Sequence, residues 1–308
     1  MTNTPRPPIQ ISGITKFYGK QAAVDDVSFN VGTGETLALL GHNGAGKTTL
    51  IKILLGLTHA DAGNVHILDH DPTSRAGALA RQDVGFLPEN VTFPIGMTGR
   101  ELLRFYARLK RAPLAQCDEL LEELGLAKAA GRRIRTYSKG MRQRLGLAQA
   151  LVGSPRLLLL DEPTSGLDPT LRHEFYEIIH RLAKGGTTVL LSSHALTEVE
   201  AQTDRIAIMK NGGLVTCGTL DDLRQQSRLP VTIRVQLADA SSTGQAAALP
   251  AAARRINDHA VELICEPGDK VALIRQVIDM GIDLEDIDIQ SATLERLYMH
   301  FRGEEAAQ

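Results

Sequence analysis

The stretch that decides the fold is LALLGHNGAGKTT, residues 37–49. It joins an apolar run, ETLALL at 35–40, through a glycine-rich turn to a helical pattern that continues to about residue 57. A strand, a glycine turn and a helix in this order form the context of the phosphate-binding motif G-x-x-x-x-G-K-[ST]. The glycines allow successive backbone N–H groups to face phosphate oxygens, and the helix N-terminus adds the positive end of a dipole. The stretch therefore predicts a nucleotide-binding loop rather than a chance glycine-rich turn.

The loop supplies candidate ligands for a nucleotide and a metal ion. Lys47 is expected to reach the β- and γ-phosphates, and the hydroxyl of Thr48 is expected to ligate Mg²⁺. The sequence therefore predicts ATP and Mg²⁺ as the bound cofactors. The candidate nucleotide-binding residues of the loop are Gly41, His42, Asn43, Gly44, Ala45, Gly46, Lys47, Thr48 and Thr49.

A second apolar run, LLLLDE at 157–162, provides two carboxylates. It is expected to be a buried strand that ends in Asp161, which places this carboxylate at the sheet edge, where it can hold the Mg²⁺ shell. Glu162 follows directly and can polarise an attacking water as a general base. A solvated acidic turn is the alternative, and the pairing with the glycine loop argues against it. We therefore predict ATP hydrolysis, with Glu162 and Lys47 among the catalytic residues.

The bulk composition is that of an ordinary globular chain. Of its 308 residues, 43% are hydrophobic and 23% are charged, and the net charge of −2 provides no electrostatic footprint for nucleic-acid binding. The cysteines Cys117, Cys217 and Cys265 are widely separated, which suits a reducing compartment and offers neither a disulfide framework nor a zinc site. The longest apolar runs fall short of the roughly 20 residues of a membrane helix, and residues 1–10 lack the apolar core of a signal peptide.

Apolar runs alternate with helical patterns along the chain, which predicts an α/β fold. Helices are expected near 99–111, 115–124 and 141–152, and from residue 156 onward buried strands alternate with amphipathic helices. Such an alternation implies a mainly parallel sheet that is covered on both faces. The runs RIAIMKNG and LVTCGT predict a hairpin around Asn211 and Gly212.

The composition changes near Leu229, and the remainder has the pattern of a small α+β domain. Its β-like runs TIRVQL and VELIC are separated by ADASSTGQAAALPAAA, a segment rich in small residues. The runs KVALIRQVIDM, IDIQ and TLERLYMHF then follow as helix, strand and helix. About 80 residues suffice for such a domain. We therefore predict a nucleotide-binding domain at 1–228 and an accessory domain at 229–308.

Over residues 9 to about 225 the chain resembles the ATP-binding cassette (ABC) ATPases. Besides the two motifs above, YSKGMRQ at 137–143 is similar to the signature segment of that family, and it opens the helical pattern MRQRLGLAQALV. The resemblance implies a RecA-like core sheet that is mainly parallel, with an antiparallel β subdomain and a helical subdomain. It also implies that Ser138 and Gly140 cap the γ-phosphate of an ATP held by a second subunit. A hydroxyl at a helix N-terminus suits an anion, although a plain capped helix is the alternative.

Four further positions align with functional elements of the family. The segment SGLD at 165–168 resembles the loop that crosses the dimer interface, which adds Asp168 to the site. His194 resembles the switch histidine at the γ-phosphate, and Tyr18 resembles the aromatic ring that stacks on adenine. Glu89 lies where the family usually has a glutamine that senses Mg²⁺ and the membrane subunit. For His194 the alternative is a structural histidine, and for Tyr18 a half-buried strand tyrosine. The catalytic residues implied are Lys47, Glu162 and His194, and the Mg²⁺ ligands are Thr48, Glu89 and Asp161.

The composite ATP sites of the family imply partners. A chain with one cassette should pair with a second copy of itself, and without a membrane span of its own it should dock on separate integral membrane subunits. We therefore expect a homodimer in the cytoplasm, peripheral on the inner face of the cell membrane, that binds no nucleic acid. A periplasmic accessory protein reached through the complex is compatible with the same resemblance.

Short segments resemble one branch of the family more narrowly. GHNGAGKTT with His42, LPENVTF at 87–93 and the ending LERLYMHF are similar to the ATPase subunit of the transporter that serves maturation of nitrous-oxide reductase, a copper enzyme. This resemblance implies export of a species needed for a periplasmic copper site. His59, His66 and His70 invite a copper-ligand interpretation, but their turn-rich surroundings favour solvated loop histidines.

Other functions stay open on the sequence. The ATPase of another exporter, for a drug, a lipid or an ion, would carry the same motifs. A soluble ABC-type module that uses ATP as a switch usually has two cassettes or a long coiled-coil insertion, whereas this chain has one cassette and an ordinary helical segment. A different P-loop enzyme, such as a kinase, would leave Ser138, Glu162 and His194 unexplained.

Overall fold

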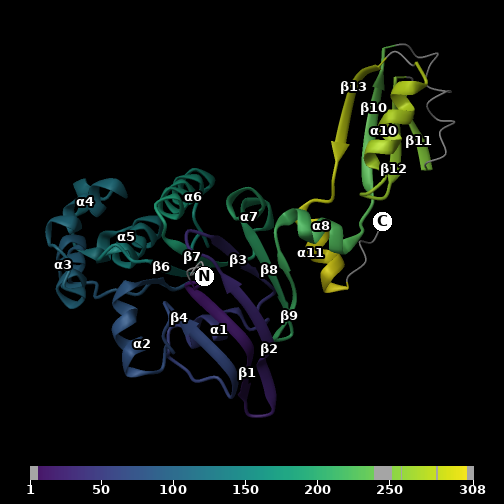
Figure 1. The fold of residues 1–308 in the computed structure, drawn as a ribbon. Coiled ribbons are helices and arrows are strands. Elements are labelled where there is room, and N and C mark those ends of the chain that lie inside the picture. The colour runs from purple at the N-terminus through teal and green to yellow at the C-terminus, as the bar shows by residue number, and fades with distance from the viewer. Residues whose placement is uncertain (1–5, 239–251, 258, 282–283, 304–308) are drawn as a thin grey trace, which may run out of the picture. The chain divides into compact units, whose positions relative to one another are not determined.

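The computed structural model describes residues 6–238, 252–257, 259–281 and 284–303 (Figure 1). The chain divides into two compact units, Met1–Cys217 and Gly218–Gln308, and each unit has a sheet and a buried core of its own. In the described ranges, no helix combines the length and the apolar character needed to cross a lipid bilayer.

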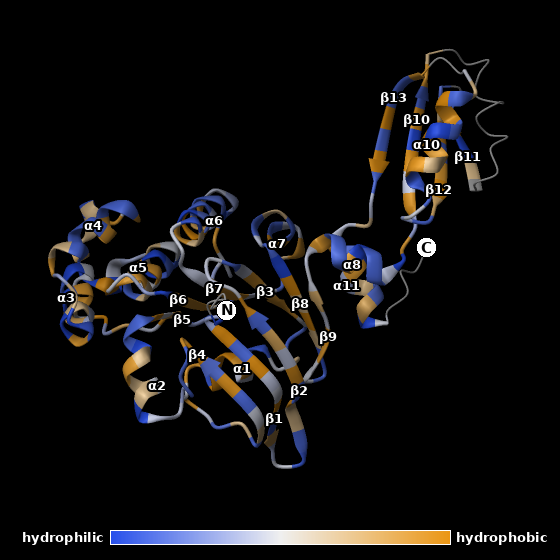
Figure 2. Cartoon of the chain, in the orientation of Figure 1, coloured by the Kyte–Doolittle hydropathy of each residue, from blue (hydrophilic) through white to orange (hydrophobic). Residues whose placement is uncertain are grey.

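A mainly parallel sheet forms the centre of the first unit, with its strands in the order β5, β6, β7, β3, β8 and β9. The pairs β5–β6, β6–β7, β7–β3 and β3–β8 are all parallel. The central residues of these strands are apolar because both faces of the sheet are covered (Figure 2). The expected parallel sheet is confirmed. Its strands are β3 (Thr36–Leu40), β5 (Val84–Leu87), β6 (Leu157–Asp161), β7 (Thr188–Ser193), β8 (Arg205–Lys210) and β9 (Gly213–Gly218).

A two-residue turn joins β8 to its neighbour β9. Asn211 and Gly212 both have positive φ, 51° and 87°, which is the conformation that a type I′ hairpin requires. The predicted hairpin at these two residues is therefore confirmed.

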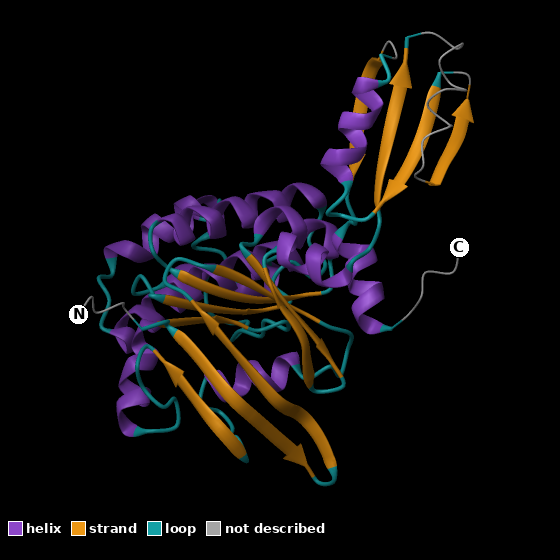
Figure 3. Ribbon diagram, turned by 45° about the vertical axis from the view of Figure 1, so that its right-hand side comes forward, coloured by secondary structure: helices purple, strands orange, loops and turns teal. Residues whose placement is uncertain are grey.

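An antiparallel sheet lies beside the central sheet in the first unit. It consists of β1 (Ile9–Tyr18), β2 (Gln21–Val31) and β4 (Ala62–Ile67), in the order β2, β1, β4. Ile11 and Val27 of this sheet share one buried cluster with Leu50 of helix α1 (Lys47–Leu54) and Leu39 of β3. Helix α1 is thus enclosed between the two sheets (Figure 3). This burial holds α1, and with it the glycine-rich loop that precedes it.

Helices complete the first unit. α6 (Pro169–Lys184) and α7 (Leu196–Gln202) lie over the face of the central sheet opposite α1 (Figure 3). The expected helices near 99–111, 115–124 and 141–152 are present, and the third begins two residues early because Ser138 caps it. They are α3 (Gly99–Lys110), α4 (Ala115–Glu123) and α5 (Lys139–Leu151), which pack together, and the remaining segments are α2 (Arg75–Ala80) and 3-10 turns at Arg81–Asp83, Ala127–Ala129 and Ile134–Thr136.

The second unit is an antiparallel sheet with one helix on its apolar face. The strand order is β11, β12, β10, β13, and Leu273 and Val277 of helix α10 pack onto Ile233 and Leu263 of the sheet. A second helical layer pairs α8 with α11, where Leu223, Leu294 and Leu297 are buried. The elements are α8 (Leu220–Ser227), β10 (Val231–Leu237), β11 (Ala252–Asn257), β12 (Ala260–Cys265), α10 (Lys270–Asp279), β13 (Leu284–Gln290) and α11 (Leu294–Arg302).

The open face of this sheet is polar. Asp288, Arg234, Glu262 and Arg254 occupy matching positions on β13, β10, β12 and β11, so that the charges alternate in sign across the four strands. Opposite charges on adjacent strands stabilise a sheet, and a face built this way is suited to contact with water. Most of the expected small-residue segment, 238–253, lies outside the described residues.

The predicted boundary between the two units needs correction. The sequence placed it after residue 228, whereas the structure places it between Cys217 and Gly218. The reason is helix α8, which begins at a capping box formed by Thr219 and Asp222 and packs on α11 at the far end of the chain. The change in composition near Leu229 marks the approach to strand β10 instead.

The separation of the two cores predicts that one unit can be weakened without the other. Leu263 is fully buried in the core of the second unit, so Leu263→Ala should destabilise that unit by about 2–5 kcal/mol through the cavity it leaves. The buried cluster that holds α1 and the glycine-rich loop consists, among the described residues, of first-unit side chains, so ATP binding should be retained. Calorimetry should show that the second unit unfolds at a lower temperature. A parallel nucleotide titration should show unchanged affinity for ATP.

A neighbouring residue on the same strand provides the control. Ile264 is 38% exposed on the opposite face, so Ile264→Ala should change the transition far less. Loss of ATP binding in Leu263→Ala at temperatures where Ile264→Ala still binds would show that the two units fold as one.

Candidate functional site

Close packing fixes the glycine-rich loop against its neighbours. A Cβ at Gly41 would lie 2.8 Å from the Cβ of Ala45 and 2.8 Å from the carbonyl oxygen of Met209 on β8. Gly46 has φ 105°, in the left-handed region, and a Cβ there would collide with the carbonyl oxygen of Ala23 on β2. Any larger residue at either position would push the loop away from the sheets that hold it.

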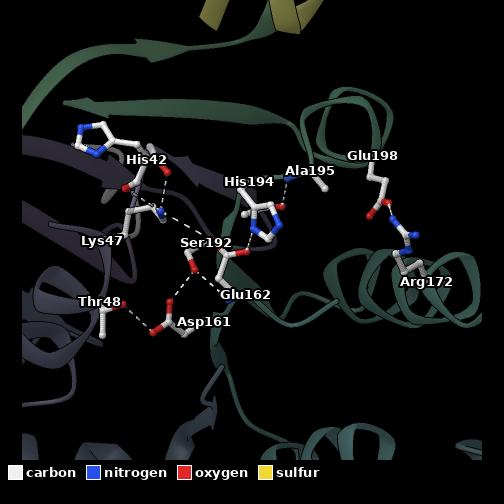
Figure 4. A network of polar contacts seen from close by, with 12 residues as sticks. His42, Lys47, Thr48, Asp161, Glu162, Arg172, Ser192, His194, Ala195 and Glu198 are labelled. Atoms are coloured by element: carbon white, nitrogen blue, oxygen red, sulfur yellow. Dashed lines mark hydrogen bonds and ion pairs between the residues drawn. The ribbon is translucent and has the colours of Figure 1, made fainter. Parts of the chain in front are cut away.

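The parallel strands bring three hydroxyl and carboxyl groups together at one edge of the central sheet. Asp161 ends β6 and is 4% exposed. Its Oδ2 accepts a hydrogen bond from the Thr48 hydroxyl at 3.0 Å, and its Oδ1 accepts one from the Ser192 hydroxyl at 2.6 Å (Figure 4). Asp161 and Ser192 are register partners on adjacent strands, so the contact follows directly from the pairing of β6 with β7.

Glu162 is held from three sides just beyond the end of β6. Its backbone has φ 48°, which a residue with a Cβ adopts only at an energetic cost, and its N–H donates to the Ser192 hydroxyl at 2.9 Å. Its Oε2 lies 2.6 Å from Nδ1 of His194, and its Oε1 lies 3.8 Å from the ammonium of Lys47 (Figure 4). The strained backbone thus aims the carboxylate between a histidine and a lysine.

Lys47 is a buried cation at the start of α1. Only 6% of it is exposed, and its ammonium donates to the carbonyl of Gly41 at 2.5 Å. Burial lowers the pKa of Lys47, and the nearby carboxylates of Glu162, Asp161 and Glu89 oppose that shift. A desolvated ammonium with a neutral carbonyl as its main partner is prepared to exchange that partner for a phosphate oxygen.

The oxygen atoms at this edge fit a magnesium ion that shares its shell with phosphates. The Thr48 hydroxyl and the Asp161 carboxylate already converge to 3.0 Å. Mg²⁺ usually takes one or two protein ligands and completes its octahedron with water and substrate phosphates. Within the described residues, no group of three or more His, Cys, Asp or Glu side chains forms a self-contained metal site.

Three predicted residues lie near this edge without joining the network. Tyr18 ends β1 with 54% of its surface exposed, and Nζ of Lys16 lies over its ring, 5.8 Å from the centroid. Glu89 is exposed in the bend after β5, and only its charge reaches Lys47. The ring of His42 contacts the carbonyl of Asn43 at 2.8 Å and points away from Asp161 (Figure 4).

A second group of predicted residues surrounds the start of α6. Ser138 caps α5 by accepting the N–H of Met141 at 3.2 Å, and Asp168 caps α6 by accepting the N–H of Leu171 at 3.0 Å. A Cβ at Gly140 would lie 3.0 Å from the Leu171 side chain, so the signature-like segment adjoins the loop at 165–168. Among the described contacts, none joins Ser138 or Asp168 to the network around Lys47 in the same chain.

Comparison with known proteins agrees with this geometry. The family model for ABC transporters matches residues 24–165. The daunorubicin resistance ATP-binding protein DrrA3 of Streptomyces coeruleorubidus is 35% identical over 96% of both chains, and the linearmycin resistance ATP-binding protein LnrL of Bacillus subtilis is 33% identical over 96% of this chain and 98% of its own. A solved ATP-binding subunit of an ABC transporter superposes with a TM-score of 0.66 at 32% identity, covering 71% of this chain and 92% of that one.

The chain belongs to the ABC transporter ATP-binding family. The α/β fold expected of it is confirmed, and the protein is an ATPase. The resemblance to the copper-related branch finds no support in these comparisons, because the named relatives are resistance proteins. His59, His66 and His70 are exposed around β4 and join no cluster of metal ligands in the described structure.

Sequence reasoning missed one residue of this ABC ATPase site. Ser192 bridges Asp161 and Glu162, accepting from one residue's backbone and donating to the other's carboxylate. A signal was present, since SSH at 192–194 places two small polar residues at the end of an otherwise apolar strand. Its partners could be named only once the register of β6 and β7 was known.

The packing of Gly46 predicts a sharp loss of nucleotide binding in Gly46→Ala. The added Cβ collides with the Ala23 carbonyl and displaces the loop, so ATP affinity should fall at least tenfold, equivalent to about 1.4 kcal/mol. Titration with a fluorescent ATP analogue would measure it. Gly186→Ala is the matched control, because Gly186 also has positive φ, 95°, but no atom within 4 Å of the new Cβ. Unchanged affinity in Gly46→Ala would mean that the loop tolerates the shift.

Proposed function

We propose that this chain is the ATP-hydrolysing subunit of an ABC exporter that removes drug-like compounds from the cell. The catalytic part of this proposal rests on one observation: Glu162 forms an ion pair with Lys47 and hydrogen bonds with Ser192 and His194. The export of drug-like compounds rests on the near full-length similarity to resistance proteins.

Each residue of the network has a distinct task in hydrolysis. Lys47 binds the β- and γ-phosphates, and Thr48 and Asp161 hold Mg²⁺, with Glu89 as an outer contributor. When bound, Mg²⁺ neutralises charge that develops on the transferring phosphoryl group. Glu162 accepts the proton of the attacking water, and His194 positions both the carboxylate and the γ-phosphate. Tyr18 stacks on adenine, since its exposed ring lies at the end of β1.

The second group of residues acts on the ATP of another subunit. Ser138 and Gly140 present a helix N-terminus, and Asp168 caps the next helix in the chain, but neither group contacts the Lys47 network of its own chain. A homodimer that places these groups over the partner's phosphates would complete two sites at once. Two bound ATP–Mg²⁺ would then hold the dimer together, and hydrolysis would release it.

Membrane subunits are the proposed site of transport, with this chain peripheral on the cytoplasmic face. Large apolar side chains are exposed on both sides of the Glu89 segment, on α2, in the loop after β5, and on α3. They are Leu79, Ile95, Phe105 and Leu109, at 65%, 64%, 49% and 61% exposure. Exposed apolar side chains gathered on consecutive elements are typical of a protein interface rather than of a free surface.

The role of Glu162 predicts that Glu162→Gln binds ATP but barely turns it over. The amide cannot accept the proton of water, so kcat should fall about 10²- to 10⁴-fold while ATP affinity stays within a few fold. Unhydrolysed ATP should also hold the dimer closed, which light scattering after size exclusion would detect. Glu174→Gln, a change to an exposed acid on α6, is the control and should resemble the unaltered protein. Normal turnover in Glu162→Gln would remove this residue from the mechanism.

The transported class is tested in cells. Expressed with its membrane subunits in a drug-sensitive bacterium, the protein should raise the inhibitory concentration of daunorubicin or linearmycin several fold, and Glu162→Gln should abolish the effect because transport needs hydrolysis. The copper-related function predicts instead that disruption lowers the copper content of nitrous-oxide reductase. If resistance does not change and the reductase is deficient in copper, the copper-related function is favoured over the proposed one.

A further inference from the structure

An ion pair links the first turns of helices α6 and α7. Arg172 lies four residues after Asp168, and Glu198 lies four residues after His194. The Arg172 guanidinium donates to the Glu198 carboxylate across the gap between the helices (Figure 4). The two side chains are 33% and 23% exposed, so the pair is partly shielded from water. The contact is therefore stronger than an ordinary surface pair.

Tyr176 closes the inner side of this pair. It lies one turn beyond Arg172 on the same face of α6, is only 3% exposed, and has its hydroxyl beside Thr164, Ser193 and Glu198. Burial raises the pKa of Tyr176 to about 12, so its hydroxyl is neutral at physiological pH. The pair is thus backed by a neutral polar group and not by another charge.

The cluster of Arg172, Tyr176 and Glu198 is more polar than stability alone would favour. Nε of Arg172 and Oε2 of Glu198 are buried, and among the described residues neither atom has a hydrogen-bond partner. Each unpaired buried group opposes folding, and apolar residues of similar size often replace such pairs without loss. A polar cluster at this position therefore calls for a functional explanation.

Arg172 and Glu198 are each connected, through the backbone and hydrogen bonds, to a segment of the ATP site. The backbone N–H of Arg172 donates to the Asp168 carbonyl at 3.0 Å, so Arg172 moves with the loop at 165–168. On the other side, the N–H of Ala195 donates to the Ser193 hydroxyl at 3.0 Å, and α7 begins at the next residue after Ala195. Glu198 therefore moves with the segment that carries His194. The ion pair is a direct side-chain link between the helices that follow these two segments.

We propose that Arg172 and Glu198 are positioning residues that couple the loop at 165–168 to His194, and that Tyr176 shields the inner side of their contact. This inference rests on the proposed function, in which a second subunit engages that loop. Docking of the second subunit against residues 165–168 shifts the start of α6, the ion pair carries the shift to the start of α7, and His194, which already lies 2.6 Å from Glu162, is aligned with the γ-phosphate. One site thereby acts only when the dimer is formed.

Steady-state kinetics on the full-length protein test the coupling. Arg172→Met and Glu198→Gln should each lower kcat at least about tenfold and bring the Hill coefficient for ATP toward one, since a small displacement of a catalytic group is costly. Affinity for ATP, measured without turnover, should stay within twofold. The double variant should be no slower than either single variant, because both remove the same link. The reversed pair, Arg172→Glu with Glu198→Arg, should recover part of kcat.

A second ion pair on the same helix provides the matched control. Arg181 of α6 pairs with Glu123 of α4 at 2.6 Å, away from the loop and from His194. Arg181→Met should leave kcat and the Hill coefficient unchanged, and melting temperatures should separate loss of coupling from loss of folding.

The outcomes distinguish this inference from the proposed function. If the unaltered protein hydrolyses ATP cooperatively and Arg172→Met does the same, the coupling is overturned while the ATPase stands. If the losses of kcat in Arg172→Met and Glu198→Gln are additive in the double variant, the two residues do not form one link and the inference is overturned. It is also overturned if these losses accompany a fall in melting temperature that Arg181→Met shows as well, because the pair is then only structural. Hydrolysis that is insensitive to Glu162→Gln would overturn the proposed mechanism instead.

Discussion

The parallel pairing of β6 with β7 and of β7 with β3 is the constraint on which the whole site depends. Pairing in parallel brings the carboxyl ends of all three strands to one edge, and each strand delivers a different group there: the glycine-rich loop, the Asp161–Glu162 pair and the His194 segment. The register of β6 and β7 sets Asp161 opposite Ser192. A slip of one strand by one residue would turn its side chains to the other face and separate these two groups.

Electrostatics at this edge are balanced within the chain before any nucleotide enters. Lys47 forms an ion pair with Glu162, and Asp161 accepts hydrogen bonds from two hydroxyls, so each charge already has a partner. Burial weakens the hold of Lys47 on its proton, while the carboxylates around it strengthen that hold. The arrival of phosphates changes this balance. The ammonium gains an anionic partner better than the Gly41 carbonyl, and the two carboxylates lose part of the positive charge that restrained them. A divalent cation would compensate this loss, and the Thr48 and Asp161 oxygens, 3.0 Å apart, are the groups that would hold it.

The sequence predicted most of the first unit because its strong patterns have local causes. A strand of leucines, a glycine turn and a capped helix each depend on neighbours within a few residues, and residues 35–54 and 157–162 were placed correctly for that reason. Ser192 was missed because its role depends on which strand lies beside β7. The boundary of the second unit was displaced because α8 packs on α11, a contact between segments far apart in the chain, although the Thr219–Asp222 capping box was visible in the sequence. The Arg172–Glu198 pair has the same origin, since no pattern within α6 or α7 indicates that their first turns meet.

The narrower resemblance to a copper-related branch failed to gain support for a physical reason. The residues that bind and hydrolyse ATP perform the same chemistry whatever is transported, so a motif such as GHNGAGKTT carries little information about the cargo. His42 illustrates the point, because its ring contacts the backbone of Asn43 and faces away from the reacting edge. Information about the cargo must instead lie on surfaces that meet other proteins. The matches to DrrA3 and LnrL extend over 96% of this chain and therefore reach into the second unit, whereas the match to the solved cassette covers 71%. Similarity over nearly the whole chain is therefore the basis on which the transported class is proposed.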